Sequence, residues 1–127
     1  MTKKNSEKMW LFMAVVEESI VPDILNGLLE LEVKGATIIN SQGMGRTIAS
    51  EFPIFAGLMN ELKGSKPYNK TIFAAVDDID LPDKLQELLL EIDLDFTQPN
   101  TGVMFMLPIV RAKGTKFDFK DNDIKES

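Results

Sequence analysis

The chain has 127 residues, a length typical of one domain, and 14 basic against 20 acidic residues give it a net charge of −6. It contains no cysteine and no histidine, which excludes Ser/His/Asp and Cys/His nucleophiles, thiolate or imidazole metal sites and a histidine pH switch. The negative charge also argues against nucleic-acid binding, which needs a basic face.

The hydrophobic segments are too short for a membrane protein. No stretch reaches the roughly 18 consecutive apolar residues of a membrane helix. The first apolar run, at residues 10–16, is followed by Glu17 and Glu18 and shows no small-residue cleavage pattern, unlike a signal peptide. The lack of cysteine fits a reducing compartment. We therefore expect a cytoplasmic protein without direct membrane insertion.

The first predicted elements are a strand and a helix. The apolar run at residues 9–16 is bounded by polar residues, which predicts a buried strand. Ser19 suits the N-cap of a following helix that has Pro22 in its first turn. Gly35 is expected to close that helix in a left-handed conformation. The apolar stripe expected to face a sheet contains Val21, Ile24, Leu25, Leu28 and Leu29.

After a second strand predicted at residues 35–39, the sequence repeats weakly at an offset of 60. Residues 14–18 read AVVEE and residues 74–78 read AAVDD, and Pro22 corresponds to Pro82. Each copy reads as an apolar strand, an acidic turn and a helix opened by proline. The repeat therefore indicates a doubled β-α-β unit.

The second copy supplies the remaining elements. Strands are predicted at residues 71–76 and 102–107, with Asp80 as the cap of the helix between them. Two β-α-β units make a split βαβ fold (βαββαβ), the α+β ferredoxin-like sandwich of one antiparallel sheet and two helices. The stripe expected on the second helix contains Leu81, Leu85, Leu88, Leu89 and Ile92.

A long connection at about residues 41–69 joins the two units. Loops of this length are usually functional or disordered. Residues 51–59 within it are apolar and favour a short helix or a docking patch. We expect a single domain over residues 1–115 and a charged tail over 116–127. The candidate partner-binding residues are Phe52, Ile54, Phe55, Leu58 and Met59.

The turn formed by Gly43, Met44, Gly45 and Arg46 follows the second predicted strand. Its two glycines allow a tight turn whose N–H groups converge on an anion, and Arg46 adds a forked cation suited to phosphate. It is not a Rossmann fingerprint, because the third glycine and the following helix are missing. A flexible hinge into the long loop remains the alternative interpretation.

Two further segments of the second half could reach the same ligand. Asn100, Thr101 and Gly102 could present backbone N–H groups and a hydroxyl, although Pro and Gly there also suit an ordinary turn. Arg111 and Lys113, with Lys116 nearby, form the basic cluster after the last strand, for which a solvated terminus is the alternative.

The acidic residues Asp77, Asp78, Asp80 and Asp83 resemble a hard-cation site in composition. They lack the glycine and distal glutamate of an EF-hand loop, and acids at a helix N-terminus are favoured by the helix dipole. The structural interpretation is therefore preferred, and no metal ligand is assigned. Because no nucleophile–base pair accompanies these acids, we do not expect an enzyme.

Three segments of this sequence resemble the PII signal-transduction superfamily, and the PII-like branch most closely. They are residues 35–46 (GATIINSQGMGR), 101–108 (TGVMFMLP) and 52–58 (FPIFAGL). The resemblance implies a homotrimer that binds an adenine nucleotide, ATP, ADP or an AMP-type ligand including cyclic AMP, with or without Mg²⁺, in clefts between subunits. It also implies a regulatory T-loop at residues 41–69 that acts on a membrane transporter or a metabolic enzyme.

The resemblance also implies residue roles. Thr37 matches a strand position that helps to hold the adenine. Gly43, Gly45 and Arg46 match the phosphate-side turn at the base of the T-loop, and Thr101 and Gly102 match the B-loop. Arg111 or Lys113 corresponds to the cations of the family's C-loop.

Four departures from the family pattern narrow the expected function, and one of them is that the family's C-terminal arginine pair is reduced here to one arginine and one lysine. Val103 occupies the position of the B-loop lysine, and Thr47 replaces the glutamine that helps to bind 2-oxoglutarate. Tyr68 lies at the far end of the loop, so the uridylylated tyrosine has no clear counterpart. We therefore do not expect 2-oxoglutarate sensing. The alternatives are a ferredoxin-like trimer that binds a metal or another metabolite, and a slow ATPase that uses acids such as Asp77.

Overall fold

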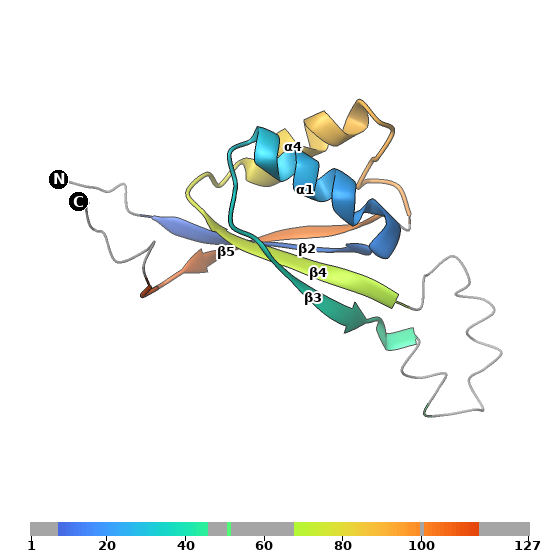
Figure 1. Ribbon diagram of the computed structural model, residues 1–127, viewed down its shortest axis with the longest axis horizontal. Coiled ribbons are helices and arrows are strands. Elements are labelled where there is room, and N and C mark those ends of the chain that lie inside the picture. The colour runs from blue at the N-terminus through green and yellow to red at the C-terminus, as the bar shows by residue number, and fades with distance from the viewer. Residues whose placement is uncertain (1–7, 46–50, 52–67, 100, 115–127) are drawn as a thin grey trace.

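The strands and helices follow one another along the chain in the predicted order βαββαβ. The structure is a computed structural model and describes residues 8–45, 51, 68–99 and 101–114 (Figure 1). Its elements are β2 (Met9–Glu17), the 3-10 turn η1 (Glu18–Ile20), α1 (Val21–Glu30), β3 (Thr37–Gln42), β4 (Tyr68–Val76), α4 (Leu81–Leu90) and β5 (Gly102–Ile109).

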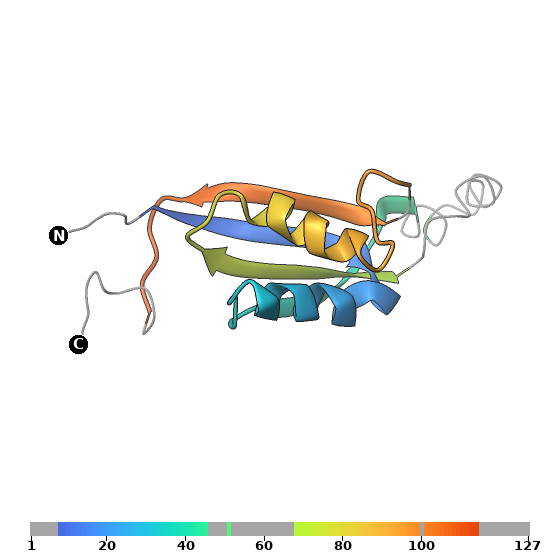
Figure 2. The same cartoon turned by 90° about the horizontal axis from the view of Figure 1, so that it is seen from above.

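The four strands form one antiparallel sheet in the order β3-β4-β2-β5. The strands that open the two halves, β2 and β4, are central, and the strands that close them form the edges. Both helices lie on the same face of this sheet, side by side (Figures 1 and 2). This arrangement confirms the α+β ferredoxin-like fold predicted from the sequence.

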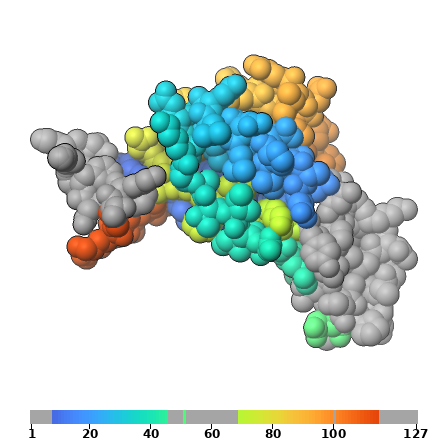
Figure 3. Space-filling model, in the orientation of Figure 1, coloured from blue at the N-terminus to red at the C-terminus, as the bar shows by residue number. Residues whose placement is uncertain are grey.

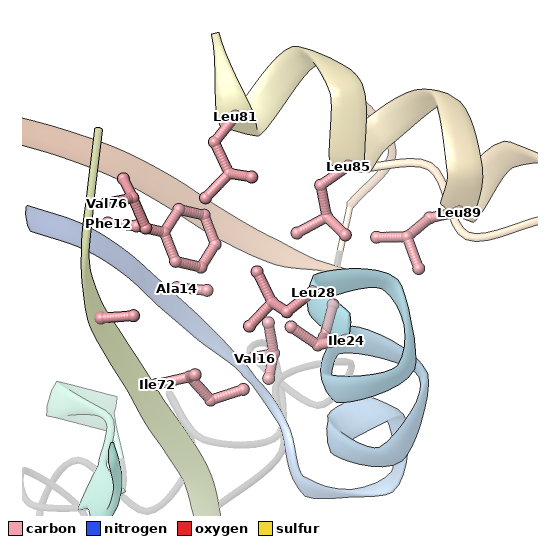
Figure 4. Close-up of a cluster of buried hydrophobic side chains, with 11 residues drawn as sticks. Phe12, Ala14, Val16, Ile24, Leu28, Ile72, Val76, Leu81, Leu85 and Leu89 are labelled. Carbon is pink, nitrogen blue, oxygen red and sulfur yellow. The ribbon is translucent and has the colours of Figure 1, made fainter. Parts of the chain in front are cut away.

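The core lies between the sheet and the helices. Every second residue of β2 and β4 faces the helices, as the period of two in a strand requires. Phe12 is the largest of these residues, and Figure 4 shows its ring beneath Leu81 of α4. The buried set is Phe12, Ala14, Val16, Ile24, Leu28, Ile72, Ala74, Val76, Leu81, Leu85 and Leu89.

Each helix begins with a proline in its first turn, as predicted, but of the two expected caps only Asp80 is confirmed, and Ser19 is wrong. Ser19 lies in η1, and the N-cap of α1 is Ile20, without a side-chain hydrogen bond. Asp80 is the N-cap of α4, but its carboxylate makes no capping bond. Instead, the Asp80 N–H donates to Asp78 Oδ1 at 2.9 Å. The acid two residues upstream stabilises this turn.

The end of α1 differs from the prediction that Gly35 closes it. Glu32 adopts the left-handed conformation, with φ of 68°, and Gly35 does not. The Val33 N–H donates to the Leu28 carbonyl at 2.8 Å, which closes a Schellman motif three residues before the glycine. Asp93 takes the corresponding position after α4, with φ of 64°.

The buried stripes of the helices are also narrower than predicted. Leu29 is 58% exposed and Ile92 is 53% exposed, and Leu88 is only half-buried, so these three residues do not face the sheet. Gly27 is buried instead, because α1 packs against Leu85 of α4 at that point. The fully buried helix residues are Ile24, Gly27 and Leu28 on α1, and Leu81, Leu85 and Leu89 on α4.

The strands also extend beyond their predicted ends. β3 occupies residues 37–42 rather than 35–39, because its pairing with β4 continues as far as Gln42 opposite Tyr68. This pairing leaves residues 43–67 as the connection between the strands. The predicted partner-binding residues Phe52, Ile54, Phe55, Leu58 and Met59, like the tail at 116–127, lie outside the described residues.

Candidate functional site

The strand register gathers both predicted ligand segments at one end of the sheet. Glu17, the last residue of β2, pairs with Asn69 of β4, and Asn69 also pairs with Ser41 of β3. Gly102, the first residue of β5, pairs with Val16 on the other side of β2. We call this end, where β3 leads into residues 43–45 and β5 begins, the loop end. The two segments lie at the same end of the sheet but on its opposite edges, with β4 and β2 between them.

The segment Gly43–Gly45, which we continue to call the glycine turn, follows β3 directly at the loop end, and its residues Met44 and Gly45 are helical. The expectation that no helix follows β3 here is therefore wrong. A Cβ atom at Gly43 would meet the Asn69 Nδ2 atom at 3.7 Å, an ordinary contact, so packing alone does not demand glycine there. Met44 is 76% exposed, and Gly45 is half-buried. Arg46 lies outside the described residues. Figure 3 shows the adjoining strand β3 at the surface below the helices.

A polar cluster that the sequence analysis did not predict lies beside this turn. The Ser41 hydroxyl donates to Asn69 Oδ1 and lies 2.9 Å from the Thr71 hydroxyl. All three side chains are on the face of the sheet opposite the helices, because Asn69 and Thr71 alternate with the buried residues of β4. The sequence analysis missed the cluster because it assigned Ser41 and Asn69 to the long loop. Their alternation with Thr71 was the available signal.

Thr37 lies away from this cluster. It begins β3 opposite Phe73 and is exposed. Ser41 comes four positions later in the strand, which corresponds to about 13 Å along it. Within one chain, the structure therefore does not bring Thr37 to the glycine turn.

The second predicted ligand segment is built around Gly102. Its φ of 143° is one that side chains rarely adopt, and a Cβ atom would lie 2.6 Å from the Val15 carbonyl oxygen. The same atom would lie 3.2 Å from Cε2 of Phe96. Gly102 therefore has a structural reason to be glycine, independent of any ligand. Thr101, next to it, is half-buried, and Asn100 lies outside the described residues.

The predicted cations after β5 lie at the opposite end of the sheet. Arg111 and Lys113 are exposed beyond Ile109, which pairs with Met9 at the start of β2. The eight residues of β5 span about 26 Å, so neither side chain reaches Thr101 of its own chain (Figure 1).

The acidic residues before α4 form a structural turn. Lys84 Nζ lies 2.5 Å from Asp78 Oδ2. The bond from Lys84 and the bond from the Asp80 N–H hold the pKa of Asp78 below its usual value, and the pKa of Lys84 is raised in return. Among the described residues, no three acidic side chains gather as a metal ion would require. The preferred structural interpretation of these acids therefore has a direct physical basis.

Comparison with known proteins supplies the fold class. No protein-family profile and no curated protein sequence matches the chain. The chain resembles the crystal structure of PII from Arabidopsis thaliana bound to citrate, with a TM-score of 0.52 and 16% identity over 80% of this chain and 78% of that one. It also resembles the apo form of CPII from Thiomonas intermedia K12, a nitrogen regulatory PII-like protein, with a TM-score of 0.50 and 18% identity over 80% and 89% of the two chains.

A further structure of CPII, bound to ADP, AMP and bicarbonate, matches with a TM-score of 0.48 and 18% identity over 80% of this chain and 92% of that one. The two preceding matches show that the chain has the fold of PII and PII-like proteins. The resemblance found in the sequence is thereby confirmed at the level of the fold. No helix within the described part of the chain is long and apolar enough to cross a membrane.

Proposed function

We propose that this protein is a PII-like signalling protein that binds an adenine nucleotide and regulates a partner, and that it is not an enzyme. The observation that carries the proposal is that Gly43–Gly45 and the Thr101–Gly102 segment lie at the same end of the sheet, the loop end, on its two opposite edges. In the sequence, both segments resemble the phosphate-side loops of that superfamily.

The ligand chemistry follows from the groups at the loop end. Backbone N–H groups of a glycine turn attract anions, and the guanidinium of Arg46 would add charge-assisted bonds to phosphate. The hydroxyls of Ser41 and Thr71 lie beside this turn and can bind a sugar or phosphate oxygen. A nucleotide held in this way would be bound rather than transformed, because none of these groups is an activated nucleophile.

We further propose that the protein is a homotrimer with its ligand sites between subunits. The face of the sheet opposite the helices carries exposed apolar side chains, and large apolar surfaces of this kind usually mark an interface. Two further copies would cover this face and could bring Arg111 and Lys113 of one subunit to the loop end of another. The exposed members of this apolar face are Ile39, Val103, Phe105 and Leu107.

The loop at residues 43–67 is the segment that we propose contacts the regulated partner. It begins at the glycine turn, so a phosphate bound there would act on the base of the loop. Its apolar residues at 52–59 are the proposed contact for a membrane transporter or a metabolic enzyme. Purification of the tagged chain from its native host should recover such a partner, and Phe55→Asp should lose it. Recovery that is unchanged in Phe55→Asp would contradict this role of the loop.

Calorimetry tests the central claim. ATP, ADP, AMP and cyclic AMP are titrated with and without Mg²⁺, and citrate is included because one structural neighbour holds it. At least one nucleotide should bind, and Arg46→Ala should weaken the binding about tenfold, the usual effect of losing one charge-assisted contact. Lys84→Ala is the matched control, because it removes a cation on the helix face of the sheet. If no nucleotide binds, the proposed function is wrong.

The alternatives have less support. Lys84 and the Asp80 N–H already bind the carboxylate of Asp78, and no group of three His, Cys, Asp or Glu side chains that could hold a metal ion is found among the described residues. Asp77 is exposed there and has no nucleophile next to it in the sequence that would suit an ATPase.

A further inference from the structure

Gln86 joins α4 to the loop that leads into the Thr101–Gly102 segment. Its Oε1 atom accepts a hydrogen bond from the Phe96 N–H at 2.9 Å, and its Nε2 atom donates to the Leu94 carbonyl oxygen at 3.3 Å. One side-chain amide therefore satisfies two backbone groups of the loop, as a neighbouring strand would. Gln86 is half-buried, so these bonds are partly shielded from water.

The helix provides a rigid base for this side chain. Leu85 and Leu89, on either side of Gln86 in the sequence, are 0% and 2% exposed in the core. A helical residue between such anchors has little freedom to move. The position of the loop is therefore set by the core of the protein through Gln86.

The loop is also ordered within itself. Asp95 Oδ1 accepts bonds from the Thr97 N–H at 2.9 Å and from the Thr97 hydroxyl at 2.7 Å. These bonds lower the pKa of Asp95. The Gln98 N–H donates to the Asp95 carbonyl at 3.0 Å. Asp95 fixes the internal shape of the turn, whereas Gln86 fixes where the turn lies relative to the sheet.

Phe96 connects the loop to the candidate site. Its ring is half-buried against the core and approaches the backbone at Gly102, where a Cβ atom would lie 3.2 Å from Phe96 Cε2. Gly102 in turn packs against the Val15 carbonyl. A displacement of Phe96 would therefore move the start of β5 and the adjacent residue Thr101.

We infer that Gln86 is a positioning residue for the ligand site, which holds the Thr101–Gly102 segment in its binding conformation without touching the ligand. This inference rests on the proposed function, because it assigns Thr101 and Gly102 to that site. If the segment occupies its binding conformation only part of the time, the apparent affinity falls in proportion to the lost fraction. Gln86 thereby raises the affinity by preorganisation rather than by contact.

The test compares Gln86→Met with the wild type and with Glu87→Met. Methionine has the length of glutamine but cannot make the two hydrogen bonds, and Glu87 is the exposed neighbour on the same helix. Hydrogen exchange at the Phe96 amide reports on the loop, and calorimetry with ADP reports on the site. Gln86→Met should speed exchange at Phe96 and weaken ADP binding about tenfold, whereas Glu87→Met should change neither.

A purely structural role predicts a different pattern. Gln86→Met would then lower the unfolding temperature but bind ADP as tightly as the wild type, and this result would overturn the inference. Unchanged exchange at Phe96 would overturn it too. Failure of the wild type to bind ADP or any other nucleotide would instead refute the proposed function, and the ligand role of Gln86 with it. If Gln86→Met does not fold, Gln86→Glu, which keeps the acceptor for the Phe96 N–H but replaces the donor to Leu94 with a carboxylate oxygen, gives the same comparison.

Discussion

Gly27 of α1 faces the tip of Leu85 of α4 so closely that a Cβ atom at Gly27 would lie 2.5 Å from Leu85 Cδ1. Leu85 is fully buried, so its side chain cannot swing into solvent to make room. The two helices therefore approach each other at a position where any residue larger than glycine requires Leu85 to shift. This close approach brings both helices onto one face of the sheet with a shared core.

Gly27→Ala should destabilise the protein although it improves helix propensity. Alanine in a helix interior is favoured over glycine by about 1 kcal/mol, but overpacking a buried site costs about 1–3 kcal/mol. We expect a net loss of about 1 kcal/mol in the free energy of unfolding, measured by urea titration at fixed protein concentration.

The same substitution should change sign when Leu85 is shortened. In a Leu85→Ala background, which itself costs about 2–5 kcal/mol, Gly27→Ala meets no side chain and should stabilise by up to about 1 kcal/mol. Asn26→Ala, on the exposed side of the same helix, is the control and should behave alike in both backgrounds. Equal effects of Gly27→Ala in both backgrounds would contradict the close contact.

Glycine matters for different reasons at the two candidate ligand segments. Gly102→Ala forces a Cβ atom against the Val15 carbonyl at a positive φ, and we expect a loss of about 3 kcal/mol in the free energy of unfolding. Gly43→Ala meets only an ordinary contact and should change stability by less than about 0.5 kcal/mol. Nucleotide binding can therefore be examined in Gly43→Ala without a folding defect, and a large loss of stability there would contradict the open geometry.

The sequence predicted the strands better than the helix faces, for a physical reason. The buried residues of the strands follow the 60-residue repeat, because Ile72 lies 60 residues after Phe12. The buried residues of the helices do not, because Leu85 lies 61 residues after Ile24. One residue rotates a helix by about 100°. The 3-10 turn η1 precedes α1, whereas a turn at Ile79 and Asp80 precedes α4. The two helices begin 60 residues apart, but their buried residues are 61 apart, so the helices bury different faces relative to their first residues.

Only part of the candidate site could likewise be predicted from the sequence. The glycine turn and the Thr101–Gly102 segment are local patterns that the sequence displays directly. The cluster of Ser41, Asn69 and Thr71 depends on the register of β3 with β4, which is set by pairing between residues far apart in the sequence. The bonds of Gln86 to the loop after α4 likewise depend on which face of the helix is buried. Such relationships follow from packing rather than from local spacing.

Phe105→Asp should convert the proposed trimer into monomers. Phe105 lies on the face of the sheet opposite the helices and is 46% exposed in the isolated chain. A carboxylate there would have to be buried in an apolar interface, at a cost of several kcal/mol for each copy, roughly enough to abolish assembly. Sedimentation should show a trimer for the wild type and a monomer for the variant, with nucleotide binding lost together with the trimer.

Ile79→Asp is the matched control for that experiment. Ile79 is 52% exposed and lies in the turn before α4, away from the sheet face. Its replacement by the same acid should leave the trimer intact. A wild type that sediments as a monomer, or a Phe105→Asp variant that remains trimeric, would contradict the proposed interface.

The bond between Asp78 and Lys84 should make stability depend on pH in the acidic range. The pKa of Asp78 lies below its usual value of 3.8, chiefly because of the hydrogen bond from Lys84. A carboxyl whose pKa is lowered by folding stabilises the native state above its unfolded pKa, and this contribution disappears as the pH falls through the folded-state pKa. The wild type should therefore unfold at a higher temperature than Lys84→Met at neutral pH, and the difference should vanish well below pH 3.8.

The raised pKa of Lys84 sets the upper pH limit of the stabilisation that the Asp78–Lys84 pair provides. Its usual value is 10.5, so the contribution is complete below that pH and is lost as the pH rises through the higher folded-state value. Because the pair is exposed, salt should weaken its effect. Lys84→Arg keeps the charge and should retain the acidic pH dependence of the wild type. A difference between the wild type and Lys84→Met that persists unchanged at the lowest pH would mean that Lys84 stabilises through its aliphatic stem rather than through Asp78.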